Sequence, residues 1–153
     1  MNETIRVGDT APDFELEDQY GEKIKLSDFE GKRVLLSWHP LAFTSVCLDQ
    51  VRSLARNYGK FEDAGVEVLS LSVDAAPSKA AWAKMAAIEK VRTRSDFNPL
   101  GATTTAYGLF LDDAGMSGRA NVLVDADGNV EWVKVYDLPE LPDVDEVLEV
   151  VGA

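Results

Sequence analysis

Short alternating segments near the start of the chain predict a β-hairpin. Residues 14–18 and 23–26 alternate apolar and polar side chains, which is the two-residue period of a half-buried strand. Gln19-Tyr-Gly21 lies between them and suits a turn. Residues 27–31 then predict a short helical turn that ends at a glycine.

Longer apolar runs predict the strands of a core sheet. Residues 34–38 and 66–73 are compact runs of the kind found in central strands that are covered on both faces. Residues 121–124 and 130–135 flank Asp125-Ala-Asp-Gly-Asn129, whose turn residues predict a hairpin. This segment also resembles the beginning of a calcium loop, but the rest of that pattern is missing, so a hairpin turn is the prediction.

Apolar residues at three- and four-residue steps predict four helices, over residues 44–62, 77–90, 99–107 and 144–151. The second of these begins at Pro77, because proline suits the first helical position. The side chains expected on its apolar face are Trp82, Met85, Ala86 and Ile88. We expect Trp82 to fill the core, with a place in the wall of a pocket as the alternative.

The order of these elements predicts the fold class. Strand, helix, strand and helix, followed by a hairpin and a helix, indicate a three-layer α/β fold with a mixed central sheet. This order resembles a thioredoxin fold with an N-terminal β-hairpin extension. The length of 153 residues fits a single domain over residues 1–153, and an apolar fraction of 46% excludes a disordered chain.

The charge balance narrows the choice of partners. The chain has 27 acidic and 15 basic residues, and its formal net charge of −12 repels phosphate backbones and anionic lipids. We therefore expect no nucleic-acid partner and no membrane partner. No apolar run approaches the ~20 residues of a membrane helix, and the first ten residues lack the features of a secretory signal. These observations predict a cytoplasmic protein.

The chain has one cysteine, Cys47, and one histidine, His39. These counts exclude an intramolecular disulfide, a CxxC redox pair and a structural zinc site of about four Cys or His ligands. A Cys–His hydrolase would need His39 as its base, although Pro40 stands between the two residues. We expect a structural role for His39, with tuning of a pocket as the alternative.

The sequence places Cys47 at the beginning of the helix predicted for residues 44–62. Thr44 is a good N-cap, or Ser45 if the helix begins one residue later, so Cys47 lies in the first turn. A sulfur there is close to unpaired N–H groups, the positive end of the helix dipole and the Thr44 hydroxyl, which favour a nucleophilic thiolate. A first-turn cysteine can also be buried and protonated, and the local residues alone leave both possibilities open.

The segment Pro40-Leu-Ala-Phe-Thr44-Ser-Val-Cys47 matches the PxxxTxxC signature of the peroxiredoxins, the thiol peroxidases of the alkyl hydroperoxide reductase and thiol-specific antioxidant family. Further segments are similar to this family, so that the resemblance covers nearly the whole chain. They are residues 8–14, 26–34, 95–101, 106–110 and 118–130.

The resemblance implies a role for four residues. Cys47 would attack a peroxide as a thiolate and become a sulfenic acid. Thr44 would hydrogen-bond the thiolate and the peroxide, and Pro40 would shield the site. Arg119 would keep the thiolate charged and polarise the O–O bond. Without the resemblance, Arg119 would be read as a solvated charge at the edge of a strand.

The resemblance also implies the partners. The sequence has no second cysteine, so it is similar to one-cysteine members, which need an external thiol such as thioredoxin, glutaredoxin or a low-molecular-weight thiol. The substrate would be hydrogen peroxide or an organic hydroperoxide, no metal or haem cofactor is expected, and a homodimer is plausible. Gln50 stands where many relatives carry Glu, which predicts that a charged contact is either absent or replaced by an amide contact.

Two alternative functions use the same cysteine. The chain could be a peroxide-sensing redox or interaction protein, in which oxidation of Cys47 changes the binding of a partner. It could also be a single-cysteine thioltransferase that acts on mixed disulfides with small thiols.

Overall fold

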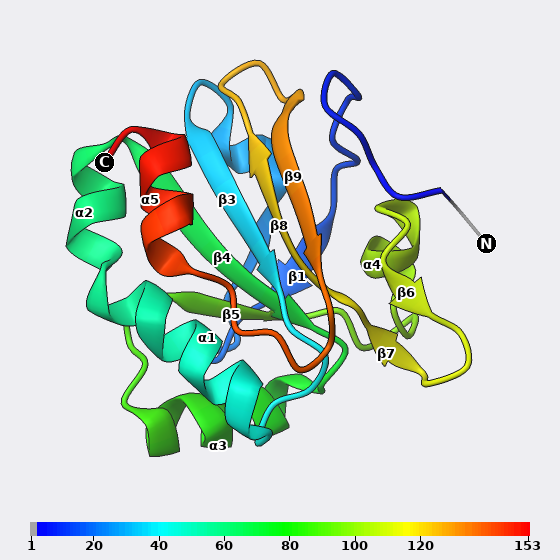
Figure 1. Cartoon of the computed structure of the whole chain (residues 1–153). Helices are drawn as coiled ribbons and strands as arrows, with labels where there is room; N and C mark the ends of the chain where they lie inside the picture. The colour runs from blue at the N-terminus through cyan, green and yellow to red at the C-terminus, as the bar shows by residue number, and fades with distance from the viewer. Residues whose placement is uncertain (1–2) are drawn as a thin grey trace.

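A seven-stranded mixed sheet forms the centre of the computed structural model, which describes residues 3–153 (Figure 1). The strand order is β2-β1-β5-β4-β3-β8-β9; β3, β4 and β5 are parallel, and the other pairs are antiparallel. The strands are β1 (Glu15–Glu17), β2 (Lys23–Lys25), β3 (Arg33–Trp38), β4 (Val66–Ser72), β5 (Arg92–Ser95), β8 (Arg119–Val124) and β9 (Val130–Tyr136). The mixed α/β prediction and the N-terminal hairpin are thus confirmed, while residues 1 and 2 of the predicted 1–153 domain lie outside the described residues.

Helices and loops cover both faces of the sheet. The helices are α1 (Ser45–Arg56), α2 (Tyr58–Asp63), α3 (Ala76–Ala86), α4 (Ala102–Ala106) and α5 (Val144–Val151), with a 3-10 turn, η1, at Leu26–Phe29. Figure 1 shows α1, α2 and α5 on one face, and α4 with the small hairpin β6 (Phe110–Leu111) and β7 (Met116–Ser117) on the other side. The core has two parts: one joins Leu35 and Val68 to α1, α3 and α5, and the other joins Leu36 and Leu69 to the N-terminal segment and Tyr107.

The helix predicted over residues 44–62 is two helices. α1 ends at Arg56 and α2 begins at Tyr58, so Asn57 separates them. The Asn57 side chain donates from Nδ2 to the carbonyl oxygen of Ser53 at 2.8 Å. Asparagine side chains compete in this way with the hydrogen bonds of a helix, whereas the apolar pattern continues across the break.

The helix predicted over residues 77–90 ends four residues early. Ala87 adopts a left-handed conformation (φ 57°) directly after α3, and the Ile88 N–H donates to the carbonyl of Ala83 at 2.8 Å. Ile88 is buried beyond the helix, as an apolar residue that follows a C-cap often is. Met85 is 52% exposed, so its predicted place on the apolar face is wrong. The helix predicted over residues 99–107 is also shorter, because α4 begins only after Gly101.

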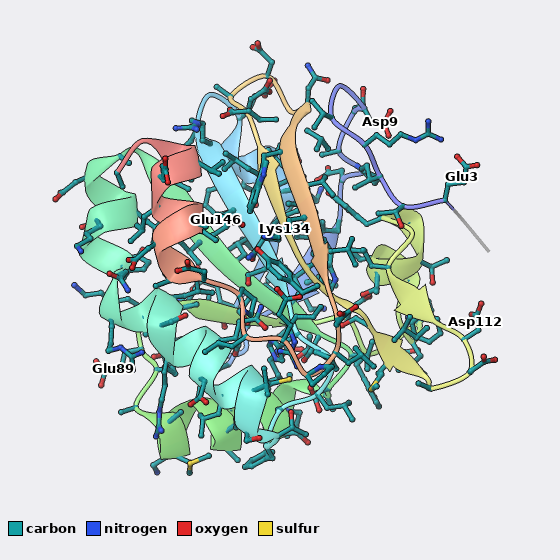
Figure 2. The ribbon with its side chains drawn as sticks, in the orientation of Figure 1. Glu3, Asp9, Glu89, Asp112, Lys134 and Glu146 are labelled. Atoms are coloured by element: carbon teal, nitrogen blue, oxygen red, sulfur yellow. The ribbon has the colours of Figure 1, made fainter. Side chains whose placement is uncertain are left out.

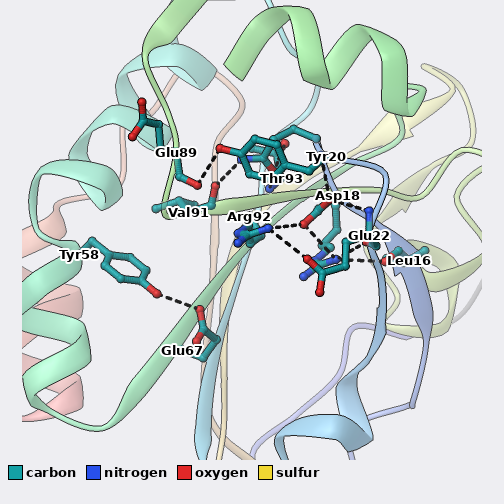
Figure 3. Close-up of polar contacts among 12 residues, drawn as sticks. Leu16, Asp18, Tyr20, Glu22, Tyr58, Glu67, Glu89, Val91, Arg92 and Thr93 are labelled. Atoms are coloured by element: carbon teal, nitrogen blue, oxygen red, sulfur yellow. Dashed lines mark hydrogen bonds and ion pairs between the residues drawn. The ribbon is translucent and has the colours of Figure 1, made fainter. Parts of the chain in front are cut away.

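The polar strand β5 was not predicted. Its sequence, Arg-Thr-Arg-Ser, has no apolar alternation, yet it lies between β1 and β4. Its side chains have polar partners instead. Arg92 pairs with the buried Asp18 at 2.8 Å (Figure 3). Arg94 donates to the carbonyl of Glu22 at 2.9 Å. These contacts join the N-terminal hairpin to the central sheet.

Charged side chains lie mostly at the periphery of the fold. Figure 2 shows Glu3, Asp9 and Asp112 projecting away from the ribbon. Lys134 on β9 pairs with Glu146 on α5 at 2.8 Å and joins the helix to the sheet. Within residues 3–153, none of the helices is both long enough and apolar enough to cross a bilayer.

Candidate active site

The carboxyl ends of the parallel strands β3 and β4 lie beside the beginning of α1. The main chain leaves β3 through His39, whose N–H donates to the carbonyl of Leu71 on β4, and then through the buried Pro40. α1 begins at Ser45, so Thr44 is the N-cap residue and Cys47 is the third residue of the helix, as predicted. Cys47 is fully buried. In open α/β sheets this is the edge at which ligands usually bind.

The fold brings Arg119 to Cys47 across 72 residues of sequence. Arg119 is the first residue of β8, which pairs with β3, and its side chain is only 3% exposed. Its Nη1 lies 3.5 Å from the Cys47 sulfur. Nε and Nη2 both donate to the carbonyl of Leu138, at 3.0 and 2.7 Å, which fixes the plane of the guanidinium. An arginine in this position can form a charge-assisted hydrogen bond with a thiolate.

Gln50 forms an amide contact, which is one of the two outcomes that its sequence position predicts. Its Oε1 accepts a hydrogen bond from Arg119 Nη1 at 2.7 Å. Its Nε2 donates to Ser37 Oγ at 2.9 Å and to the Trp38 carbonyl at 3.1 Å. In the part of the chain that the structure describes, the oxygen partners of Arg119 are therefore an amide and a backbone carbonyl, both uncharged. A glutamate at position 50 would compete with a thiolate for the positive charge, and glutamine does not.

A row of buried polar residues crosses the sheet beneath α1 and α3. Asn121, Ser37, Ser70 and Thr93 are neighbours on β8, β3, β4 and β5, and each is at most 1% exposed. Ser37 binds Gln50, and Ser70 Oγ lies 3.1 Å from His39 Nδ1. Two serines of the row therefore bind side chains of the site, Gln50 and His39. This explains why a serine interrupts the apolar sequence of β3 and of β4.

Thr44 lies at the predicted position, but its hydroxyl contacts a different group. Oγ1 donates to the Leu41 carbonyl at 2.8 Å, and Thr44 is exposed. A hydroxyl has one hydrogen and two lone pairs, so Thr44 can still accept a hydrogen bond from a hydroperoxide. It would have to rotate before it could donate to Cys47. Its contact with the thiolate stays a prediction, as does the shielding role of Pro40.

The single histidine belongs to a polar network that the sequence did not reveal. His39 is fully buried; its ring lies 4.9 Å from that of Trp82, and its Nε2 lies 3.3 Å from Nζ of the buried Lys79. Burial, and then the positive charges of Lys79 and Arg119, lower the pKa of His39 well below its usual value of 6.5. The ring is therefore neutral at pH 7. Lys79 precedes Trp82 by three residues and so lies on the same face of the helix. This spacing could have predicted that Lys79 points toward the core.

The comparisons with known proteins agree with this fold and site. The AhpC/TSA family matches residues 7–133. The chain is 35% identical to alkyl hydroperoxide reductase E of Mycobacterium tuberculosis over 140 residues, which are 91% of each chain. It is 34% identical to peroxiredoxin-2 of Mus musculus over 160 residues, covering 97% of this chain and 78% of the mouse protein.

A solved structure shows the same architecture. The reduced 2-Cys peroxiredoxin of Plasmodium vivax superposes with a TM-score of 0.87 at 32% identity, over 96% of this chain and 80% of that one. The molecule is thus an enzyme of the peroxiredoxin class with a thioredoxin-like fold. The chain belongs to the AhpC/TSA family, and its single cysteine fits the one-cysteine type.

Proposed function

We propose that this peroxiredoxin reduces hydrogen peroxide or small organic hydroperoxides through Cys47 and is then regenerated by an external thiol. The observation that carries the proposal is the 3.5 Å contact between the sulfur of Cys47 and Arg119 Nη1. Within residues 3–153, the oxygen partners of the guanidinium are Gln50 and Leu138, and both are uncharged. A thiolate at Cys47 would be the anion that complements its charge.

In the first step, the thiolate sulfur attacks the terminal peroxide oxygen. The S–O bond forms as the O–O bond breaks, which oxidises the sulfur to a sulfenic acid and reduces the peroxide. The departing hydroxide or alkoxide takes up a proton and leaves as water or an alcohol. Negative charge moves from the sulfur along the O–O bond during this step, and Arg119 lies where it can stabilise that charge.

The second half of the cycle needs a thiol from outside the chain. One thiol condenses with the sulfenic acid and releases water, and a second thiol displaces the Cys47 thiolate from the mixed disulfide. Thioredoxin, glutaredoxin and low-molecular-weight thiols are the candidate reductants. A homodimer would not change this need, because a second copy brings only another Cys47.

Intact-mass measurement tests the proposal directly. One equivalent of hydrogen peroxide is expected to add one oxygen atom to the reduced protein, and excess thiol is expected to restore the original mass. Repeated cycles with fresh peroxide should then consume thiol catalytically. Oxidation that thiols reverse without such turnover would favour the peroxide sensor, and activity on a glutathionylated substrate without peroxide turnover would favour the thioltransferase.

Replacing Thr44 by valine is expected to lower kcat/KM for hydrogen peroxide by about tenfold or more, because a hydrogen bond near a charged group contributes roughly 1.5–3 kcal/mol. Steady-state peroxide consumption measures the effect. Ser45→Ala removes an exposed hydroxyl from the next residue and should change kcat/KM little. If Thr44→Val and Ser45→Ala had equal kcat/KM, the Thr44 hydroxyl would have no role in peroxide reduction.

A further inference from the structure

A lysine lies in the core beside the site. Lys79 on α3 is fully buried, although lysine rarely is unless its charge has a partner. Its Nζ donates to Ser72 Oγ at 2.6 Å and lies 3.3 Å from His39 Nε2. It also lies 5.6 Å from the centre of the Trp82 ring, whose π face attracts a cation. The ammonium group is therefore bound inside the protein by Ser72, His39 and the Trp82 ring.

The network continues from Lys79 to the loop that precedes Cys47. Ser72 Oγ donates to Asp74 Oδ2 at 2.6 Å. The same carboxylate oxygen accepts a hydrogen bond from the N–H of Ala42 at 2.9 Å. Lys79 is thus connected through one hydroxyl to an anion, and through that anion to the segment that carries the PxxxTxxC residues.

The charges around Lys79 couple it to Cys47. Burial lowers the pKa of Lys79 to about 7, while Asp74 and Cys47 act in the opposite direction and raise it. The neutral His39 lies 3.3 Å from Lys79, and the charges of both Lys79 and Arg119 lower its pKa. Electrostatic coupling is reciprocal, so the ammonium of Lys79 stabilises a thiolate as much as the thiolate stabilises the ammonium.

We propose that Lys79 is a positioning residue of the peroxidatic site, a second cation that supports the Cys47 thiolate together with Arg119, and that Asp74 keeps it charged. The inference rests on the proposed role of Cys47. The ammonium of Lys79 would favour the charged form of Cys47, because an opposite charge in a buried site is weakly screened by solvent.

The ultraviolet absorbance of the thiolate, followed against pH, tests this proposal without peroxide turnover and without reagent access to a buried sulfur. Cys47→Ser provides the blank. Lys79→Met is expected to move thiolate formation to higher pH and to lower the ratio of thiolate to thiol at a given pH by about three- to tenfold. Lys84→Met, the same substitution at an exposed site on α3, should match the wild type. Matching curves for Lys79→Met and the wild type would overturn the proposal.

The variant Asp74→Asn tests whether the thiolate population rises or falls when the carboxylate charge is removed. If Asp74 acted only directly on Cys47, removal of its negative charge would increase the thiolate population. If it acts through Lys79, the lysine loses its proton more readily and the thiolate population falls. We expect a fall in Asp74→Asn, and no further fall when it is combined with Lys79→Met. An increase or no change in Asp74→Asn would overturn the proposal, even if Lys79→Met did not fold.

Measuring peroxide consumption as well shows whether the proposed function or only the role of Lys79 is wrong. If the wild type failed to turn over peroxide, the function would be wrong, but the thiolate curves would still report on Lys79. If peroxide turnover were normal and the curves of wild type and Lys79→Met coincided, only the role of Lys79 would be wrong.

Discussion

Serine at position 47 is expected to abolish peroxide turnover, with a loss on the order of 10³-fold or more. A serine hydroxyl stays protonated at neutral pH and has no oxidation state equivalent to a sulfenic acid, so neither step of the cycle can proceed. Peroxide consumption with excess thiol measures the loss. Retention of turnover in Cys47→Ser would contradict the proposed mechanism.

A relocated thiol provides the matched control. Cys47→Ser combined with Ser45→Cys keeps one cysteine in the chain but moves it to an exposed position at the beginning of α1. This variant lacks the contact with Arg119 and should not regain turnover. Recovery of activity would mean that any cysteine near the helix N-terminus suffices. Thermal unfolding should show that both variants remain folded.

The local sequence was sufficient to place Cys47. Thr44 and the apolar spacing after it predicted the start of a helix, and the structure has Cys47 at the third helical residue. The same local reasoning could not find Arg119, because its role depends on the pairing of β8 with β3 across 72 residues. Only the resemblance to a known family identified it.

Buried polar residues account for two features that the sequence analysis missed. β5 lacks an apolar pattern because its arginines find partners in the N-terminal hairpin. Lys79 was overlooked because a lysine is normally a surface residue, and its burial depends on Ser72 and His39, which come from other elements. Such partners are set by the tertiary structure, which hydrophobic periodicity does not report.

The contact between Gln50 and Arg119 shows how one substitution can change the electrostatics of the site. An amide oxygen accepts the same hydrogen bond from Nη1 as a carboxylate oxygen would, at 2.7 Å in this structure, but brings no negative charge. The positive charge of Arg119 is therefore available to Cys47.

Replacing Arg119 by methionine is expected to lower kcat/KM for hydrogen peroxide by about 10²–10³-fold, the usual cost of removing a group that stabilises developing charge. The variant should also be less stable, because Gln50 Oε1 and the Leu138 carbonyl lose their donor, and an unpaired buried acceptor costs roughly 1–3 kcal/mol. Peroxide kinetics and denaturant unfolding measure the two effects separately.

Two further variants separate charge from geometry at this position. Arg119→Lys keeps the charge, but one ammonium cannot reproduce the planar set of contacts to Cys47, Gln50 and Leu138, so intermediate activity is expected. Arg56→Met removes an exposed arginine at the end of α1 and should leave kcat/KM unchanged. Activity of Arg119→Met within a few-fold of Arg56→Met would show that the guanidinium does not stabilise the transferring charge, and Arg119 would then serve only to hold Gln50 and Leu138 in place.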